Sequence, residues 1–84
     1  MSMSAAESEL VETRLRAVFS RVFGKQVPYR PDLRRTDEAR WTSLKHVELL
    51  VAIEKEFGLR FDGADAMDMS GVDAVLQLLQ QRVR

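Results

Sequence analysis

Two neighbouring hydroxyl side chains, Thr42 and Ser43, are the groups of this chain best placed to take part in covalent chemistry. They directly precede a run with helical apolar periodicity, and both residue types cap helices by accepting a hydrogen bond from a free N–H group of the first turn. Those N–H groups also favour a nearby anion, so a phosphate ester on a hydroxyl here would lie in a favourable field. Two interpretations stay open: Ser43 only caps the helix, or it carries such an ester.

The remaining reactive side chains do not combine into a catalytic or metal site. The chain has one histidine, His46, and no cysteine, which excludes a site of several histidines, a thiolate site and a cysteine nucleophile. A general-base role for His46 would need both a nucleophile and an orienting partner, and the sequence offers no clear set of the two, so we expect His46 to be passive, at most touching a group bound at Ser43. Three aspartates, Asp62, Asp65 and Asp68, lack the spacing and the final glutamate of a calcium loop. We therefore expect no catalytic residue, no metal site and no enzymatic activity.

The hydroxyls stand at the start of a helix that is predicted to run from Ser43 to Phe57 and to end at Gly58. One side of this helix carries the residues expected to face the core, which are Leu49, Leu50, Ile53 and Phe57. The other side carries a second apolar stripe with charges among its members, made of Leu44, Val47, Glu48, Val51 and Lys55. A short chain is not expected to cover both faces of a helix. We therefore interpret the second stripe as a partly exposed docking patch, the alternative being a helix buried all round.

The helix expected before this one is capped by Ser8 and ends near Phe23, followed by Gly24. Its predicted core positions are Val11, Leu15, Val18, Phe19 and Val22, and its solvated face carries Arg14, Arg16 and Arg21. Residues 24–41 then form a long connection, in which Pro28 and Pro31 block regular helix. The expected anchors of this loop are Val27, Tyr29 and Leu33, and Trp41 is expected to half-bury its ring and so to set where Ser43 points.

Two further helical segments are expected after Gly58. Asp62 is predicted to cap a single short turn, with Met67 and Met69 facing inward. Ser70 is predicted to open a capping box for the last helix, whose core positions are Val72, Val75, Leu76, Leu79 and Val83. The fold class predicted is all-α: a small four-helix bundle of three main helices plus one short helix, with a long loop between the first two.

Length and composition set the outer limits of function. The 84 residues are expected to form one domain, 1–84, with residues 1–6 disordered. No apolar run is long enough to insert into a membrane and no secretion signal is visible, so a cytoplasmic protein is expected. The formal net charge of zero argues against nucleic-acid binding. Acids dominate the second half of the chain and allow an acidic face around the helix at 43–57, diluted by Lys45 and Lys55.

The string S-L-K-H-V-E-L-L-V-A-I-E-K-E-F-G, residues 43–58, resembles the second helix of acyl carrier proteins. The likeness extends loosely over residues 9–83 in helix order, loop position and spacing. In that family the serine of a D-S-L motif carries 4′-phosphopantetheine through a phosphodiester, which implies this role for Ser43. Thr42 stands where the family usually has aspartate, and Trp41 makes the motif similar to the W-x-S-L variant of some free-standing carriers in specialised pathways.

The resemblance implies a monomeric carrier that holds acyl or aminoacyl groups as thioesters in fatty-acid, polyketide or related biosynthesis. Its expected partners are a phosphopantetheinyl transferase and the enzymes that load and use the acyl group. Docking is assigned to Leu44, Val47, Glu48 and Val51, and neither nucleic acid nor membrane insertion is expected. The alternative is a non-covalent helical interaction module in which Ser43 is only a helix cap.

Overall fold

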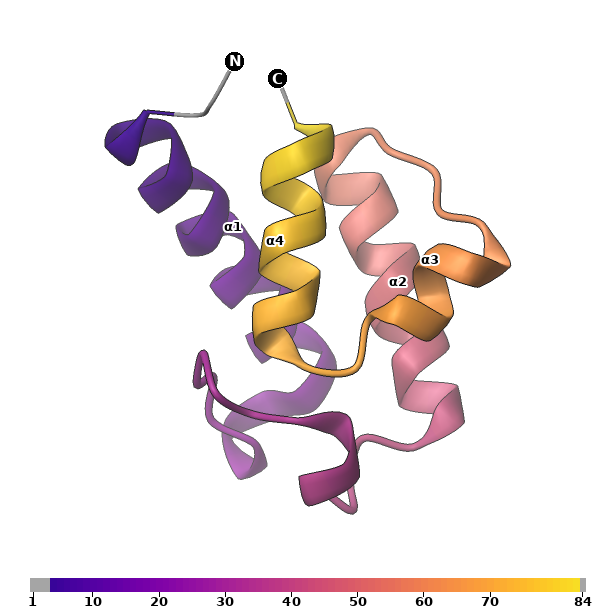
Figure 1. Ribbon diagram of the computed structural model, residues 1–84. Helices are drawn as coiled ribbons and strands as arrows, with labels where there is room; N and C mark the ends of the chain where they lie inside the picture. The colour runs from indigo at the N-terminus through magenta and orange to yellow at the C-terminus, as the bar shows by residue number, and fades with distance from the viewer. Residues whose placement is uncertain (1–3, 84) are drawn as a thin grey trace.

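The computed structural model describes residues 4–83, which form an all-α bundle of three main helices and one short helix, as predicted. The main helices are α1 (Ala5–Phe23), α2 (Ser43–Phe57) and α4 (Val72–Arg82), and the short one is α3 (Gly63–Asp68). In Figure 1, α1, α4 and α2 stand beside one another and α3 crosses next to α2. Helix α1 packs against both α2 and α4. Across the described residues, every helix is too short or too polar to span a lipid bilayer.

Helix α1 begins one turn earlier than the sequence predicts. Ser4, not Ser8, is the N-cap: its hydroxyl accepts from the N–H of Glu7, whose carboxylate accepts from the N–H of Ser4. The expectation that residues 1–6 are disordered is therefore wrong for residues 4–6, and residues 1–3 lie outside the described part of the chain. The predicted core stripe is confirmed, with one shift: Phe23 is buried and Val22 is only half-buried.

Helix α2 has the predicted bounds. Gly58 ends it in the left-handed conformation, at φ 66°, where a residue without Cβ is unstrained. The predicted core side is confirmed, since Leu49 and Ile53 are fully buried while Leu50 and Phe57 pack half-buried against the core. The interpretation of α2 as a helix buried all round is wrong.

The long loop is held to the bundle at both ends. It contains two short 3-10 turns, Gly24–Gln26 and Arg35–Asp37, and buries the predicted anchors Val27 and Leu33. Its middle part runs antiparallel to the α3–α4 link for one bridge between Arg34 and Gly71. The carbonyl of Leu33 accepts from the N–H of Val72 at 2.9 Å, so the loop satisfies a free donor of the first turn of α4.

Two predictions for the second half of the chain are wrong. Ser70 does not cap the last helix: Gly71 is the N-cap residue and provides no side-chain cap bond. The loop passes so close to Gly71 that a Cβ there would lie 2.6 Å from the carbonyl oxygen of Leu33. Met67 does not face inward, since it lies on the solvent side of α3 and is 84 % exposed, whereas Met69 is completely buried. The predicted cap of α3 is confirmed, with Asp62 and Asp65 forming a capping box.

Candidate functional site

The two hydroxyl residues at the N-terminus of α2, Thr42 and Ser43, have different roles. Thr42 is the N-cap: its Oγ1 accepts from the N–H of Lys45 at 3.2 Å, and its carbonyl accepts from the N–H of His46 at 2.9 Å. Ser43 is the first residue inside the helix. The interpretation of Ser43 as the helix cap is therefore wrong, because Thr42 already does this work.

The Ser43 side chain is exposed, and its hydroxyl makes no hydrogen bond with any residue from 4 to 83. The backbone N–H groups of Ser43 and Leu44 also lack an acceptor within this part of the chain. Two free donors at the positive end of a helix favour an anion beside them. An ester phosphate on Ser43 would lie in this field.

A buried pair of rings supports this end of α2. Trp41 is 4 % exposed, not half-buried as predicted, and packs edge to face against Phe19 and Phe23, with ring centroids 5.9 and 5.5 Å away. Its indole N–H donates to Nδ1 of His46 at 3.0 Å. Because Nδ1 accepts, Nε2 carries the proton and donates to the carbonyl of Ala66 in α3, 2.9 Å away.

His46 is therefore a structural residue that joins the loop, α2 and α3. Burial lowers the pKa of its imidazole, helped by the positive charge of Arg35 and opposed by the carbonyl of Ala66. The side chain is only 5 % exposed and both of its nitrogens are engaged. The structure thus gives His46 a packing and hydrogen-bonding role, and its contact with a group bound at Ser43 stays a prediction.

The second apolar stripe of α2 lies at the surface, next to Ser43 along the helix. Leu44 is 69 % exposed, Val47 55 % and Val51 42 %. On the opposite side of the same helix Leu49 is 1 % exposed and Ile53 is not exposed at all. The expectation of an exposed stripe is confirmed, and its three members contribute little to the core.

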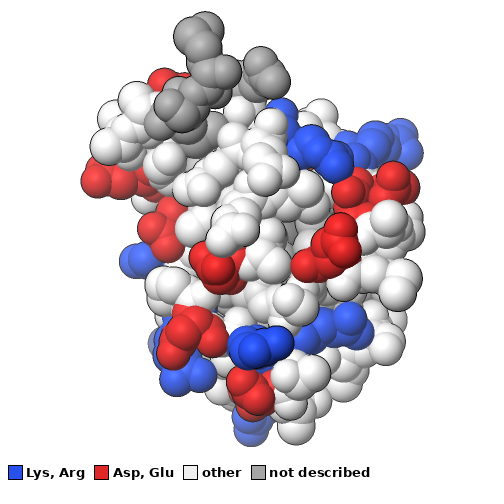
Figure 2. Space-filling view, viewed as in Figure 1, with Lys and Arg blue, Asp and Glu red and all other residues white. Residues whose placement is uncertain are grey.

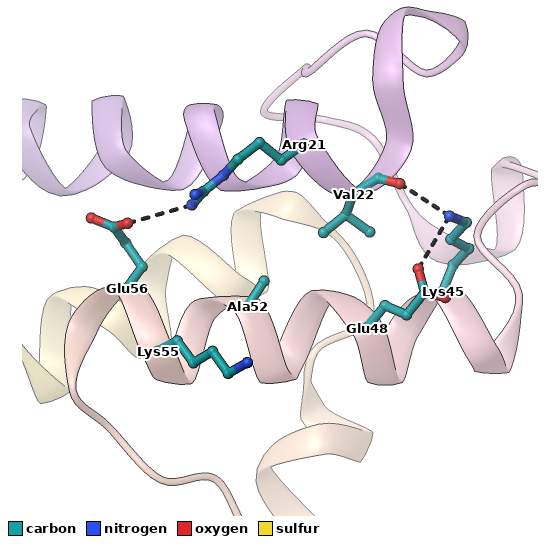
Figure 3. Close-up of a pocket in the computed structure, with 7 residues that line it drawn as sticks. All are labelled: Arg21, Val22, Lys45, Glu48, Ala52, Lys55 and Glu56. Atoms are coloured by element: carbon teal, nitrogen blue, oxygen red, sulfur yellow. Dashed lines mark hydrogen bonds and ion pairs between the residues drawn. The ribbon is translucent and has the colours of Figure 1, made fainter.

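A groove between α1 and α2 borders this stripe. It has a volume of about 460 Å³ and is lined by Arg21, Val22, Lys45, Glu48, Ala52, Lys55 and Glu56. Figure 3 shows Lys45 bridging the two helices at one end of the groove. Its ammonium group donates to the carbonyl of Val22 and to the carboxylate of Glu48, both at 3.1 Å.

The other end of the groove is closed by Glu56. Its carboxylate lies 3.4 Å from Arg21 (Figure 3). The same carboxylate accepts from Arg14 at 3.0 Å. Arg14 also donates to the backbone carbonyl of Glu56 and stacks over the ring of Phe57, 4.4 Å from its centroid. The prediction that Arg14 belongs to a solvated face is wrong, since it ties α1 to the end of α2.

The acidic face that the sequence allows around α2 is largely neutralised by these pairs. Glu48 forms an ion pair with Lys45, and Glu56 forms one with Arg14. The side of the molecule with α4 in front carries acidic and basic side chains around a mostly uncharged centre (Figure 2). Neither region is dominated by one sign of charge.

Comparisons with models of known protein families, with curated proteins and with solved structures found no match for this chain. The functional interpretation therefore rests on the geometry around Ser43 and on the resemblance of residues 43–58.

The remaining candidates of the sequence have structural roles. The hydroxyl of Tyr29 donates to Glu12 at 3.1 Å, and its ring packs edge to face on Phe19, so the prediction of a packing residue is confirmed. Burial, together with the charge of Glu12, raises the pKa of Tyr29. Asp65 pairs with Arg82 at 2.8 Å, which keeps the pKa of its carboxyl below the ordinary value.

Proposed function

We propose that this protein is an acyl carrier: it bears a 4′-phosphopantetheine arm on Ser43 and presents acyl or aminoacyl thioesters to partner enzymes. The observation that supports the proposal most directly is that Thr42, and not Ser43, caps α2. Thr42 caps the helix, so that the neighbouring hydroxyl of Ser43 is exposed and free of hydrogen bonds within residues 4–83. A residue kept only for capping would be engaged with the backbone.

The residues at this position fit a phosphodiester. The Ser43 oxygen would form the new ester bond as the pyrophosphate of coenzyme A breaks and its nucleotide half leaves, with the serine proton passing to a base of the transferase. The phosphate charge would then lie beside the free N–H groups of Ser43 and Leu44. When attached, the arm supplies a terminal thiol that holds the cargo as a thioester, outside the closed helical core.

The rest of the domain supplies a rigid base and a contact surface. Trp41 and His46 hold the start of α2 against the loop and α3, so the attachment point is tied to the bundle through two buried rings. The exposed stripe of Leu44, Val47 and Val51 is small, which suits brief contacts with a series of enzymes. A tethered substrate gains effective concentration at each enzyme it reaches.

The proposal is tested by incubating the protein with a broad-specificity phosphopantetheinyl transferase and coenzyme A, followed by intact-mass analysis. The wild type should gain the mass of one arm, and Ser43→Ala should gain none. Ser20→Ala removes another exposed helical serine and should load like the wild type. Loading of Ser43→Ala, or no loading of the wild type by several transferases, would refute the assignment.

A variant of the neighbouring residue tests the resemblance itself. Thr42→Asp restores the D-S-L string and keeps a side chain that can accept from the N–H of Lys45. We expect it to fold as the wild type does and to load faster. Equal or slower loading would mean that the transferase does not read this position as it does in the family.

The exposed stripe also favours a second function, a non-covalent interaction module. Three large apolar side chains in solvent on one helix face are typical of a binding surface. This function predicts no mass gain with any transferase, and a complex whose affinity falls when Leu44 or Val51 is truncated but not when Ser43 is.

A further inference from the structure

The charged side chains of α2 are, with one exception, already engaged inside the molecule. Glu48 and Glu56 form the ion pairs described above, and Glu54 accepts a 2.8 Å hydrogen bond from the N–H of Phe61. Lys55 is exposed and forms no ion pair or hydrogen bond with any residue from 4 to 83. The ammonium of Lys55 is therefore the charged group of α2 that a partner can pair with without breaking a contact inside residues 4–83, although the helix holds more acids than bases.

The unpaired ammonium lies at the edge of the apolar stripe. Lys55 follows Val51 by four residues, and Val51 follows Val47 by four, so the three side chains are neighbours along one face of α2. The Lys55 side chain also lines the groove between α1 and α2 (Figure 3). Apolar contact and an unpaired charge thus belong to one continuous surface.

The groove beside the stripe has an excess of one positive charge among its lining side chains. Three cations line it against two carboxylates: they are Arg21, Lys45 and Lys55 against Glu48 and Glu56. A basic partner would find no unpaired carboxylate here and would be repelled by Lys55. A partner with a carboxylate next to an apolar cluster would pair with Lys55 without breaking an ion pair inside this protein.

We propose that the stripe of Leu44, Val47 and Val51, together with Lys55, docks partner proteins through an amphipathic helix whose apolar face is flanked by carboxylates. This rests on the proposed function in that the partners are the enzymes that meet the carrier. It names their chemistry: acidic and apolar, not basic.

The test uses two synthetic helical peptides with the same leucine stripe, one flanked by glutamates and the other by lysines. Each is titrated into isotope-labelled wild-type protein and followed by NMR chemical shifts. The acidic peptide should shift the amides around Val47, Val51 and Lys55 and bind more tightly than the basic one. Lys55→Glu should weaken the acidic peptide by about fivefold, the scale of one exposed ion pair, and favour the basic one.

Arg30→Glu is the matched control, since it makes the same charge change at an exposed loop position outside the groove. It should leave the preference for the acidic peptide unchanged, and Lys55→Gln should lose part of that preference. The inference is overturned if the basic peptide binds as well or better, if neither peptide shifts the stripe, or if Arg30→Glu acts as strongly as Lys55→Glu.

Intact-mass analysis of arm loading, run on the same samples, separates the two proposals. If the protein accepts the arm but does not prefer the acidic peptide, the carrier function stands and the proposed acidic partner is refuted. If the protein prefers the acidic peptide but does not accept the arm, the docking surface stands and the carrier function is refuted.

Discussion

The indole N–H of Trp41 donates to Nδ1 of His46 across 3.0 Å inside the bundle, and this bond determines which nitrogen of the imidazole carries the proton. The other nitrogen, Nε2, then donates a hydrogen bond to the carbonyl of Ala66. Three segments that are separate in the sequence are joined by one neutral ring, one turn from the candidate attachment serine.

Protonation of His46 should weaken this junction. Burial lowers the pKa of the folded imidazole below its ordinary value of 6.5, so the unfolded chain takes up a proton first as the pH falls. The stabilising contribution of neutral His46 is complete above pH 6.5 and is lost as the pH falls from there towards the folded pKa. Urea unfolding at a series of pH values should show a falling free energy of unfolding in that window.

His46→Gln is the control for this titration, because an amide can accept from Trp41 and donate to Ala66 without titrating. Its stability should change less than that of the wild type over the same pH range, whatever its absolute value. Parallel curves for the two proteins would show that another group is responsible.

The two hydroxyls at the start of α2 should differ in their effect on stability. Thr42→Ala removes the oxygen that accepts from Lys45 and should lower the free energy of unfolding by about 1 kcal/mol. Ser43→Ala should change it by less than about 0.5 kcal/mol, because the hydroxyl is exposed and not a cap. Thermal and urea unfolding measure both, and an equal loss would return Ser43 to a capping role.

Truncation of α2 should separate its two apolar sides. Leu49→Ala opens a cavity in the core and should cost about 2–5 kcal/mol. Leu44→Ala, at a side chain that is 69 % exposed, should stay within about 0.5 kcal/mol of the wild type. If Leu44→Ala proved strongly destabilising in chemical unfolding, the stripe would belong to the core and could not be a docking surface.

The link between the loop and α4 should not accept a side chain at Gly71. A Cβ there would lie 2.6 Å from the carbonyl oxygen of Leu33, so Gly71→Ala must push the loop away and should cost about 1–3 kcal/mol. Gly63→Ala is the matched control, because a Cβ at that position meets no atom within 4 Å. The added methyl group also lowers the conformational entropy of the unfolded chain. It should raise the free energy of unfolding by about 0.4–1 kcal/mol, as measured by urea denaturation.

The sequence by itself determined the features that depend on neighbours along the chain. The period of apolar residues predicted the bounds of α2 and its two faces, and the cap of α3 followed from an aspartate before a helical turn. These signals are local, because a helix is built from contacts three and four residues apart. The early start of α1 was missed because Ser4 and Ser8 are both acceptable caps, and the choice of Ser4 comes from its reciprocal bonds with Glu7.

Only the tertiary structure decided which side chains meet across the chain. Three contacts of this kind cannot be predicted from residue type. They join Trp41 to His46, Arg14 to Glu56, and the loop to Gly71. The charges of α2 are such a case. Counted along the sequence the helix is acidic, but packing against α1 pairs Glu56 with Arg14 and Arg21, whereas Lys55 has no partner among residues 4–83. Charge at a surface depends on distances between elements, and those are settled by the fold.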